Sequence, residues 1–146
     1  MEQIAQTLEN KGAKRLKKEK LAKSVELCDA LVLSPGIPID HPIAIAFKRK
    51  GKALLGETEL AAREIRATVI AITGTNGKTT SVSMLTQILE KGGVHTKACG
   101  NIGLPMVDFC GMEKEAIAVA EISSFQMETL NSLRPHIAVI LNITED

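Results

Sequence analysis

The segment Gly74-Thr75-Asn76-Gly77-Lys78-Thr79-Thr80 follows the apolar run 69–72 and opens an amphipathic segment. Glycines allow the backbone to turn tightly enough for several N–H groups to converge on one anion, and a following helix adds its positive end. In such a loop Lys78 reaches the terminal phosphates and Thr79 offers its hydroxyl to Mg²⁺. The segment therefore predicts a strand, a phosphate-binding loop and a helix.

This loop is two residues shorter than the common phosphate-binding pattern. That pattern places a glycine five residues before Gly77, where this chain has Ile72, and its first glycine is instead Gly74. The alternative is a glycine turn that only joins a strand to a helix, but it leaves Lys78 and the two threonines without a role. We therefore expect residues 74–80 to bind nucleotide phosphates.

Composition describes a globular chain of 146 residues, of which 45% are apolar and 24% are charged. The formal charge of +1 gives no general attraction to nucleic acid, and with three Phe and no Trp or Tyr nothing suggests a base-stacking surface. Cys28, Cys99 and Cys110 lack metal-ligand spacing, so we expect buried, reduced thiols.

No apolar run approaches the ~20 residues that a membrane-spanning helix needs. The N-terminus also lacks a secretory signal pattern. The sequence therefore predicts a cytoplasmic protein without a membrane partner.

Residues 1–66 read as alternating helices and strands. Helices are expected over 2–10, from Pro42 to about residue 50 and over 57–66, and strands over 30–33 and 52–55. The basic run from Lys14 to Lys20 is expected to form a solvated helix face, in preference to a patch that binds phosphate or a membrane. Asp40 is the expected cap of the helix that begins near Pro42.

A second unit begins near Thr68. Its sequence pattern predicts strands over 69–73, 94–98, 117–122 and 137–141, and helices over 78–91 and about 125–133. The runs 117–122, apart from Glu121, and 137–141 are apolar, which is typical of strands buried on both faces of a parallel sheet. The expected fold is therefore α/β, with three layers and a mostly parallel sheet.

Polar residues follow three of these strands, and parallel strands would bring them to one edge of the sheet. They are the loop 74–80, Glu121 with Ser123, and the segment 142–146. Glu121 is the expected partner of Thr79 in binding Mg²⁺. Alternatively, Glu121 is only a helix N-terminal residue and Ser123 is the cap. The turn 100–103 is a weaker signal, since its glycines could simply shape the backbone.

Several strings together resemble the Mur ligase family in order and spacing, and the short loop is the form that this family uses. The strings are Leu33-Ser34-Pro35-Gly36-Ile37-Pro38, the loop 74–80, Gly100-Asn101-Ile102-Gly103-Leu104-Pro105, Glu121-Ile122-Ser123-Ser124-Phe125-Gln126-Met127-Glu128 and Leu141-Asn142-Ile143-Thr144-Glu145-Asp146. The Ser-Ser-Phe-Gln string favours the family members that add D-glutamate.

The resemblance implies a ligase that uses ATP to phosphorylate the carboxylate of UDP-N-acetylmuramoyl-L-alanine, a precursor of cell-wall peptidoglycan, before D-glutamate attacks. It implies that Lys78 and the other loop residues, Gly74, Thr75, Asn76, Gly77, Thr79 and Thr80, hold ATP. Lys78 and Glu121 become catalytic residues, and Thr79 and Glu121 the Mg²⁺ ligands. Asn101 and Ser123 would face the muramoyl substrate, and Gly36 the uridine nucleotide.

The resemblance also implies a division of the chain and missing parts. Residues 1–66 would be a partial Rossmann-like domain for the UDP substrate, and residues 67–146 the front half of the central ATP-binding domain. The family's D-glutamate site has no counterpart here, so a fragment that is inactive alone and self-associates through exposed core is expected. The alternatives are a non-catalytic fragment that binds nucleotide phosphates, or another amide-forming ligase of the Mur or folylpolyglutamate type.

Overall fold

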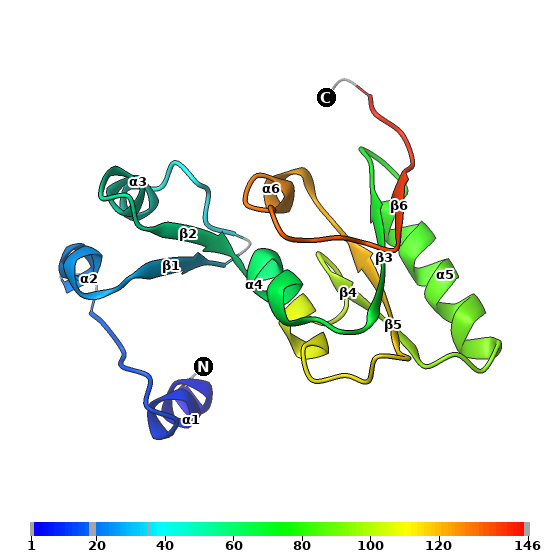
Figure 1. Ribbon diagram of the computed structural model, residues 1–146, viewed down its shortest axis with the longest axis horizontal. Helices are drawn as coiled ribbons and strands as arrows, with labels where there is room; N and C mark the ends of the chain where they lie inside the picture. Colours follow the sequence, from blue (N-terminus) through cyan, green and yellow to red (C-terminus); the bar gives the residue numbers. More distant parts are fainter. Residues whose placement is uncertain (1, 18–19, 35, 145–146) are drawn as a thin grey trace.

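The apolar runs of the sequence form strands, and the strands make two separate parallel sheets (Figure 1). The structure is a computed structural model, and it describes residues 2–17, 20–34 and 36–144. The smaller sheet pairs β1 (Ala30–Leu33) with β2 (Ala53–Gly56), and α3 (Pro42–Arg49) connects these two strands. A strand, a crossover helix and a parallel strand make one βαβ unit.

The larger sheet has four parallel strands in the order β4-β5-β3-β6. The strands are β3 (Thr68–Thr73), β4 (Thr96–Gly100), β5 (Ile117–Glu121) and β6 (Ile137–Ile140). The register pairs Ile72 with Glu121 and Thr73 with Ile140. The segments that follow β3, β5 and β6 therefore leave the sheet at one edge, as the sequence predicts.

Helices cover both faces of the larger sheet. On one face α5 (Lys78–Lys91) places Val82 against a cluster of strand residues that includes Ile72 and Val119. On the other face, Ala61 of α4 (Glu57–Glu64) and Phe109 of the 3₁₀ helix η2 (Met106–Phe109) join a core that contains residues of β3, β4 and β5. The predicted three-layer α/β arrangement is confirmed.

Helix α4 serves both sheets. It follows β2 directly and contacts the smaller sheet, yet its buried face packs on η2 and on the core of the larger sheet. It lies between the two sheets in Figure 1. The division of the chain after residue 66 stays a prediction, but packing makes α4 a shared element.

Two predictions for the first 66 residues are wrong. Residues 14–17 form no helix, because helix α1 (Glu2–Asn10) ends before them and α2 (Leu21–Leu27) begins after them; residues 18 and 19 lie outside the described part. The cap of α3 is His41, whose Nδ1 accepts a hydrogen bond from Ile43 N at 3.3 Å, and not Asp40. The His41 imidazole thus takes the capping role that was expected of the Asp40 carboxylate.

Three predictions about burial and length also need correction. Strand β6 is not buried on both faces, because Ile137 and Ile140 are 53% and 65% exposed at the end of the strand order. The helix expected over 125–133 is only α6 (Ser124–Met127), since turns take over after it. Among the cysteines, Cys28 is exposed, whereas burial raises the pKa of Cys99 to about 12.

No helix in the described part of the chain has the length and apolar character needed to cross a membrane.

Candidate functional site

The predicted phosphate loop connects β3 to α5. Gly74 and Gly77 adopt φ values of 143° and 81°, which residues other than glycine rarely adopt. The N–H groups of residues 77–80 find no acceptor among the described residues, because they precede or begin α5. Several donors at a helix N-terminus are thus available to an anion.

Lys78 folds back over this loop. Its Nζ donates to Gly74 O at 2.6 Å and to Thr75 O at 3.0 Å. An ammonium group has three donors, so one remains for a ligand. The two carbonyl bonds fix the positive charge beside the free N–H groups.

A buried carboxylate faces the first turn of α5. Glu121, at the end of β5, is 1% exposed, and its Oε2 accepts from Thr79 Oγ1 at 2.8 Å. Its Oε1 accepts from Asn101 Nδ2, also at 2.8 Å. The alternative in which Glu121 serves only as a helix N-terminal residue does not describe this geometry, because its carboxylate contacts other elements.

The Asn101 turn depends on two glycines. Gly100 and Gly103 have φ values of 91° and 69°, and Asn101 N donates to Glu121 O at 2.9 Å. A Cβ added to Gly100 would overlap Glu121 O, and a Cβ added to Gly103 would overlap Ala98 O. The glycines therefore shape the turn, and that shape brings the Asn101 amide to Glu121.

Substituting Gly100→Ala should lower the free energy of unfolding by roughly 2 kcal/mol, because the new Cβ combines a left-handed φ with a backbone overlap. Urea unfolding measures the change. Gly111→Ala is the matched control, since a Cβ there meets nothing within 4 Å. Equal stability of the two variants would contradict the role of Gly100.

Ser123 caps the short helix α6. Its hydroxyl accepts from Gln126 N at 3.2 Å and lies 3.1 Å from Gln126 Oε1, which also accepts from Ser123 N. The Gln126 amide in turn donates to Thr58 Oγ1 at 2.9 Å. The capping alternative is thus confirmed for Ser123. Its position beside the loop also makes it available to a ligand.

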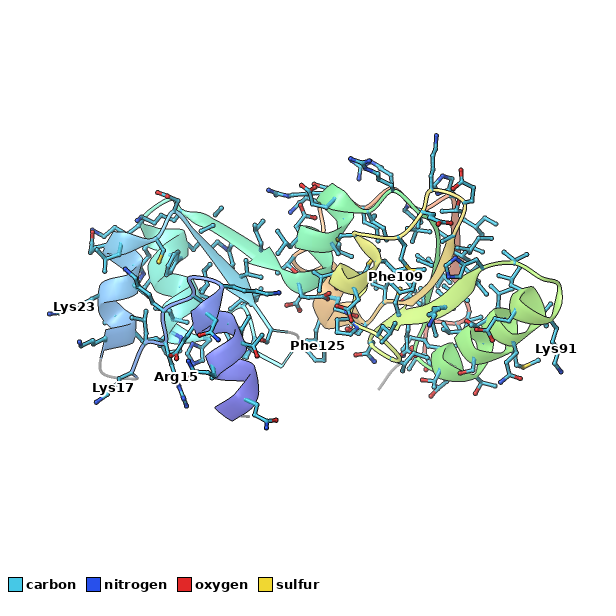
Figure 2. All side chains as sticks on the ribbon, turned by 90° about the horizontal axis from the view of Figure 1, so that it is seen from below. Arg15, Lys17, Lys23, Lys91, Phe109 and Phe125 are labelled. Carbon is cyan, nitrogen blue, oxygen red and sulfur yellow. The ribbon has the colours of Figure 1, made fainter. Side chains whose placement is uncertain are left out.

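Some of the predicted site residues line two neighbouring cavities, whereas Thr79 and Glu121 line neither. One of about 630 Å³ is lined by Gly74, Thr75, Lys78, Asn101 and Ser123, among others. The other, of about 360 Å³, is lined by Gly36, by residues near β1 and β2, and by α6. Gly36 is therefore not brought to the loop. Phe125 lines both cavities, and Figure 2 shows it at the junction between the two sheets.

The donor set fits a magnesium–nucleotide pair better than a self-contained metal centre. Thr79 and Glu121 supply one hydroxyl and one carboxylate, and the described residues contain no cluster of three or more His, Cys, Asp or Glu side chains. Mg²⁺ commonly takes one or two protein oxygens and completes its octahedron with water and phosphate oxygens. The pair could hold Mg²⁺ in that manner.

Sequence reasoning gave no role to Asn142, although it placed the segment 142–146 at this edge. Asn142 contacts the backbone of Thr75 and Asn76, while Glu145 and Asp146 lie outside the described residues. The signal was present in the sequence as a polar residue directly after an apolar strand. What it touches could not be read from that position.

Comparison with known proteins points to one family. Residues 72–146 match the family described as Mur ligase middle domain. A UDP-N-acetylmuramoylalanine--D-glutamate ligase of Desulfatibacillum aliphaticivorans is 46% identical over 119 residues, which are 81% of this chain and 26% of that protein. The ligase of the same name from Clostridioides difficile is 42% identical over 85% of this chain and 28% of its own length. The chain spans about a quarter of the length of these relatives.

A solved structure shares the fold. It is the UDP-N-acetylmuramate:L-alanyl-gamma-D-glutamyl-meso-diaminopimelate ligase from Neisseria meningitides, with a TM-score of 0.54 and 20% sequence identity. The match covers 86% of this chain and 45% of that one. At this identity the likeness supports the arrangement of strands and helices alone.

Proposed function

Because the chain belongs to the Mur ligase family, we propose that it supplies the ATP site of a ligase that joins D-glutamate to UDP-N-acetylmuramoyl-L-alanine. The observation that carries the proposal is the cluster of Lys78, Thr79 and Glu121 around a loop with free N–H groups. The names of the relatives at 42% to 48% identity support D-glutamate as the amino acid.

The proposed reaction has two transfers. A carboxylate oxygen of the muramoyl substrate attacks the γ-phosphorus of ATP, and ADP leaves. The amine of D-glutamate then attacks the acyl carbon, phosphate leaves, and the amine loses a proton as the amide forms. Such a reaction depends on positioning and on neutralising phosphate charge. ATP and UDP-linked precursors are cytoplasmic metabolites, which favours a cytoplasmic location for this chemistry.

The residues of the site divide this work. Lys78 and the N–H groups of residues 77–80 would bind phosphate oxygens, where they neutralise charge without moving. Thr79 and Glu121 would hold Mg²⁺, which when bound neutralises further phosphate charge. Asn101 holds Glu121 in place through the 2.8 Å bond to its Oε1.

The muramoyl substrate would extend from the loop cavity to the neighbouring one. Asn101 and Ser123 line the first, near the reacting carboxylate, and Gly36 lines the second, where the uridine end would lie. Phe125, which is 70% exposed and lines both, would form the wall that they share. Residues 1–66 would thus contribute the part of the site that binds the uridine nucleotide of the substrate.

Calorimetry tests the proposal on this chain. We expect it to bind a non-hydrolysable ATP analogue in the presence of Mg²⁺, and to bind UDP-N-acetylmuramoyl-L-alanine more tightly than UDP-N-acetylmuramate. Failure to bind the ATP analogue would remove the nucleotide site. Tighter binding of a UDP-muramoyl dipeptide or tripeptide would instead assign the chain to another amide-forming reaction.

The exposed edge of β6 should promote self-association, since one side of the strand has no partner in the described sheet and its Ile137 and Ile140 are exposed. Size-exclusion chromatography should show apparent mass rising with concentration. The variant Ile137→Lys places a charge on this edge and should reduce that rise. A monomeric profile at all concentrations would contradict the prediction.

A further inference from the structure

We propose that Asn142 is a positioning residue that sets the shape of the phosphate loop and decides which loop N–H groups are left for the anion. The inference deepens the proposed function and rests on it for the identity of the anion. Thr75 and Asn76 would have their N–H groups engaged by Asn142. The anion would be bound by the N–H groups of residues 77–80.

The Asn142 side chain pairs with one residue of the loop in both directions. Its Oδ1 accepts from Asn76 N at 2.9 Å, and its Nδ2 donates to Asn76 O at 3.0 Å. Its own backbone O accepts from Thr75 N at 3.1 Å. A primary amide has the donor and the acceptor that such a pairing needs, whereas a carboxylate has only acceptors. Asn142 therefore acts on the loop as a neighbouring strand would.

Gly74 makes room for this contact. An added Cβ at Gly74 would lie 3.1 Å from both Asn142 N and Asn142 O and 3.2 Å from Leu141 Cβ. The close approach of the segment 141–142 thus favours glycine here, in addition to the φ of 143°. Thr144 N also donates to Thr75 Oγ1 at 3.1 Å, so the segment after β6 contacts the loop at Thr144 as well as at Asn142.

The pairing divides the donors of the loop. The N–H groups of Thr75 and Asn76 both bond to Asn142, while those of residues 77–80 have no acceptor in the described part of the chain. Lys78 Nζ bonds to the carbonyls of Gly74 and Thr75, so the lysine is fixed to the part of the loop that Asn142 holds. A loop ordered before the ligand arrives loses less conformational entropy on binding.

The experiment combines amide hydrogen exchange with calorimetry on the whole chain. In Asn142→Ala, we expect the Asn76 amide to exchange at least about tenfold faster, because its acceptor is gone. We expect the affinity for a non-hydrolysable ATP analogue with Mg²⁺ to fall about tenfold, in line with two lost hydrogen bonds. The melting temperature should change little, since the bonds lie at the surface.

Two further variants separate positioning from general destabilisation. Asn142→Asp keeps an acceptor for Asn76 N but loses the donor to Asn76 O, so exchange at Asn76 should be slower than in Asn142→Ala and faster than in the unmodified chain. Asn131→Ala is the matched control, because within the described residues Asn131 contributes only backbone atoms to hydrogen bonds. Neither exchange at Asn76 nor affinity should change in the control.

The outcomes distinguish this inference from the proposed function. Slow exchange at Asn76 in Asn142→Ala would overturn the inference whether or not nucleotide binds. Faster exchange with unchanged nucleotide affinity would also overturn it, since the loop would then bind the anion without Asn142. If the unmodified chain binds no nucleotide, the proposed function fails, and exchange at Asn76 still decides whether Asn142 holds the loop.

Discussion

Lys78→Ala is expected to lower the affinity for an ATP analogue with Mg²⁺ by about 100-fold. Charge-assisted hydrogen bonds contribute roughly 1.5–3 kcal/mol, and 2.7 kcal/mol corresponds to a factor of 100. The loss includes the ammonium charge that Gly74 O and Thr75 O hold over the loop. Lys78→Arg should restore little, because a planar guanidinium cannot reproduce the same three directions of donation.

The matched control for this prediction lies on the same helix. Lys91 ends α5 at the far end from the loop, as Figure 2 shows, and its side chain is exposed. Lys91→Ala removes the same charge from the chain and should leave the affinity unchanged. Calorimetry at a fixed ionic strength compares the variants. Equal affinities of Lys78→Ala and the unmodified chain would remove the loop from the binding site.

Glu59→Ala is expected to lower the free energy of unfolding by roughly 3 kcal/mol, because it removes a buried, hydrogen-bonded carboxylate and leaves its donors unpaired. Glu59 is 0% exposed. Its oxygens accept from Asn131 N at 2.8 Å, Ser132 N at 2.9 Å and Ser132 Oγ at 2.7 Å, and Arg63 Nε lies at 3.0 Å. These bonds attach α4 to the chain between α6 and β6.

The same contacts make this contribution depend on pH. Burial raises the pKa of Glu59, but the hydrogen bonds from Asn131, Ser132 and Arg63 outweigh it and lower the pKa from 4.5 to about 2. Because the folded pKa lies below the unfolded one, the stabilisation is fully present above pH 4.5. It is lost as the pH falls from 4.5 through about 2.

Urea unfolding of Glu59→Gln at several pH values measures this effect. The stability gap between the unmodified chain and Glu59→Gln should be full at pH 7 and should narrow below pH 4.5, where the unmodified chain also becomes protonated. Glu64→Gln changes an exposed residue of the same helix, so its stability should differ little from that of the unmodified chain at every pH measured. A gap for Glu59→Gln that does not vary with pH would refute the explanation.

The elements that the sequence predicted best are those with local causes. The bounds of α1 and α5 match the expected ones, because each has apolar periodicity and a glycine near its end. The burial of a strand depends instead on its neighbours. The runs 117–122, apart from Glu121, and 137–141 look alike in sequence, yet β5 lies between two strands, whereas β6 has one partner strand among the described residues.

The candidate site divides in the same manner. Lys78, Thr79 and Glu121 were predicted together because strand ends in a parallel sheet meet at one edge, and the 2.8 Å contact of Thr79 with Glu121 agrees with that prediction. The Gln126 bond to Thr58 was not predicted, since the two residues are 68 positions apart. Neither residue has a local pattern that requires the other.

By itself, the sequence determined the kind of chemistry: a short glycine loop with a lysine and two threonines after an apolar strand, and a carboxylate after another. Only the tertiary structure decided which groups hold that loop and its neighbours in place. Asn142 reaches Asn76 across 66 positions, and Glu59 reaches Asn131 across 72. Hydrogen bonds require specific atoms within about 3 Å, and for residues so far apart in the chain only the packing of helices and strands provides that proximity.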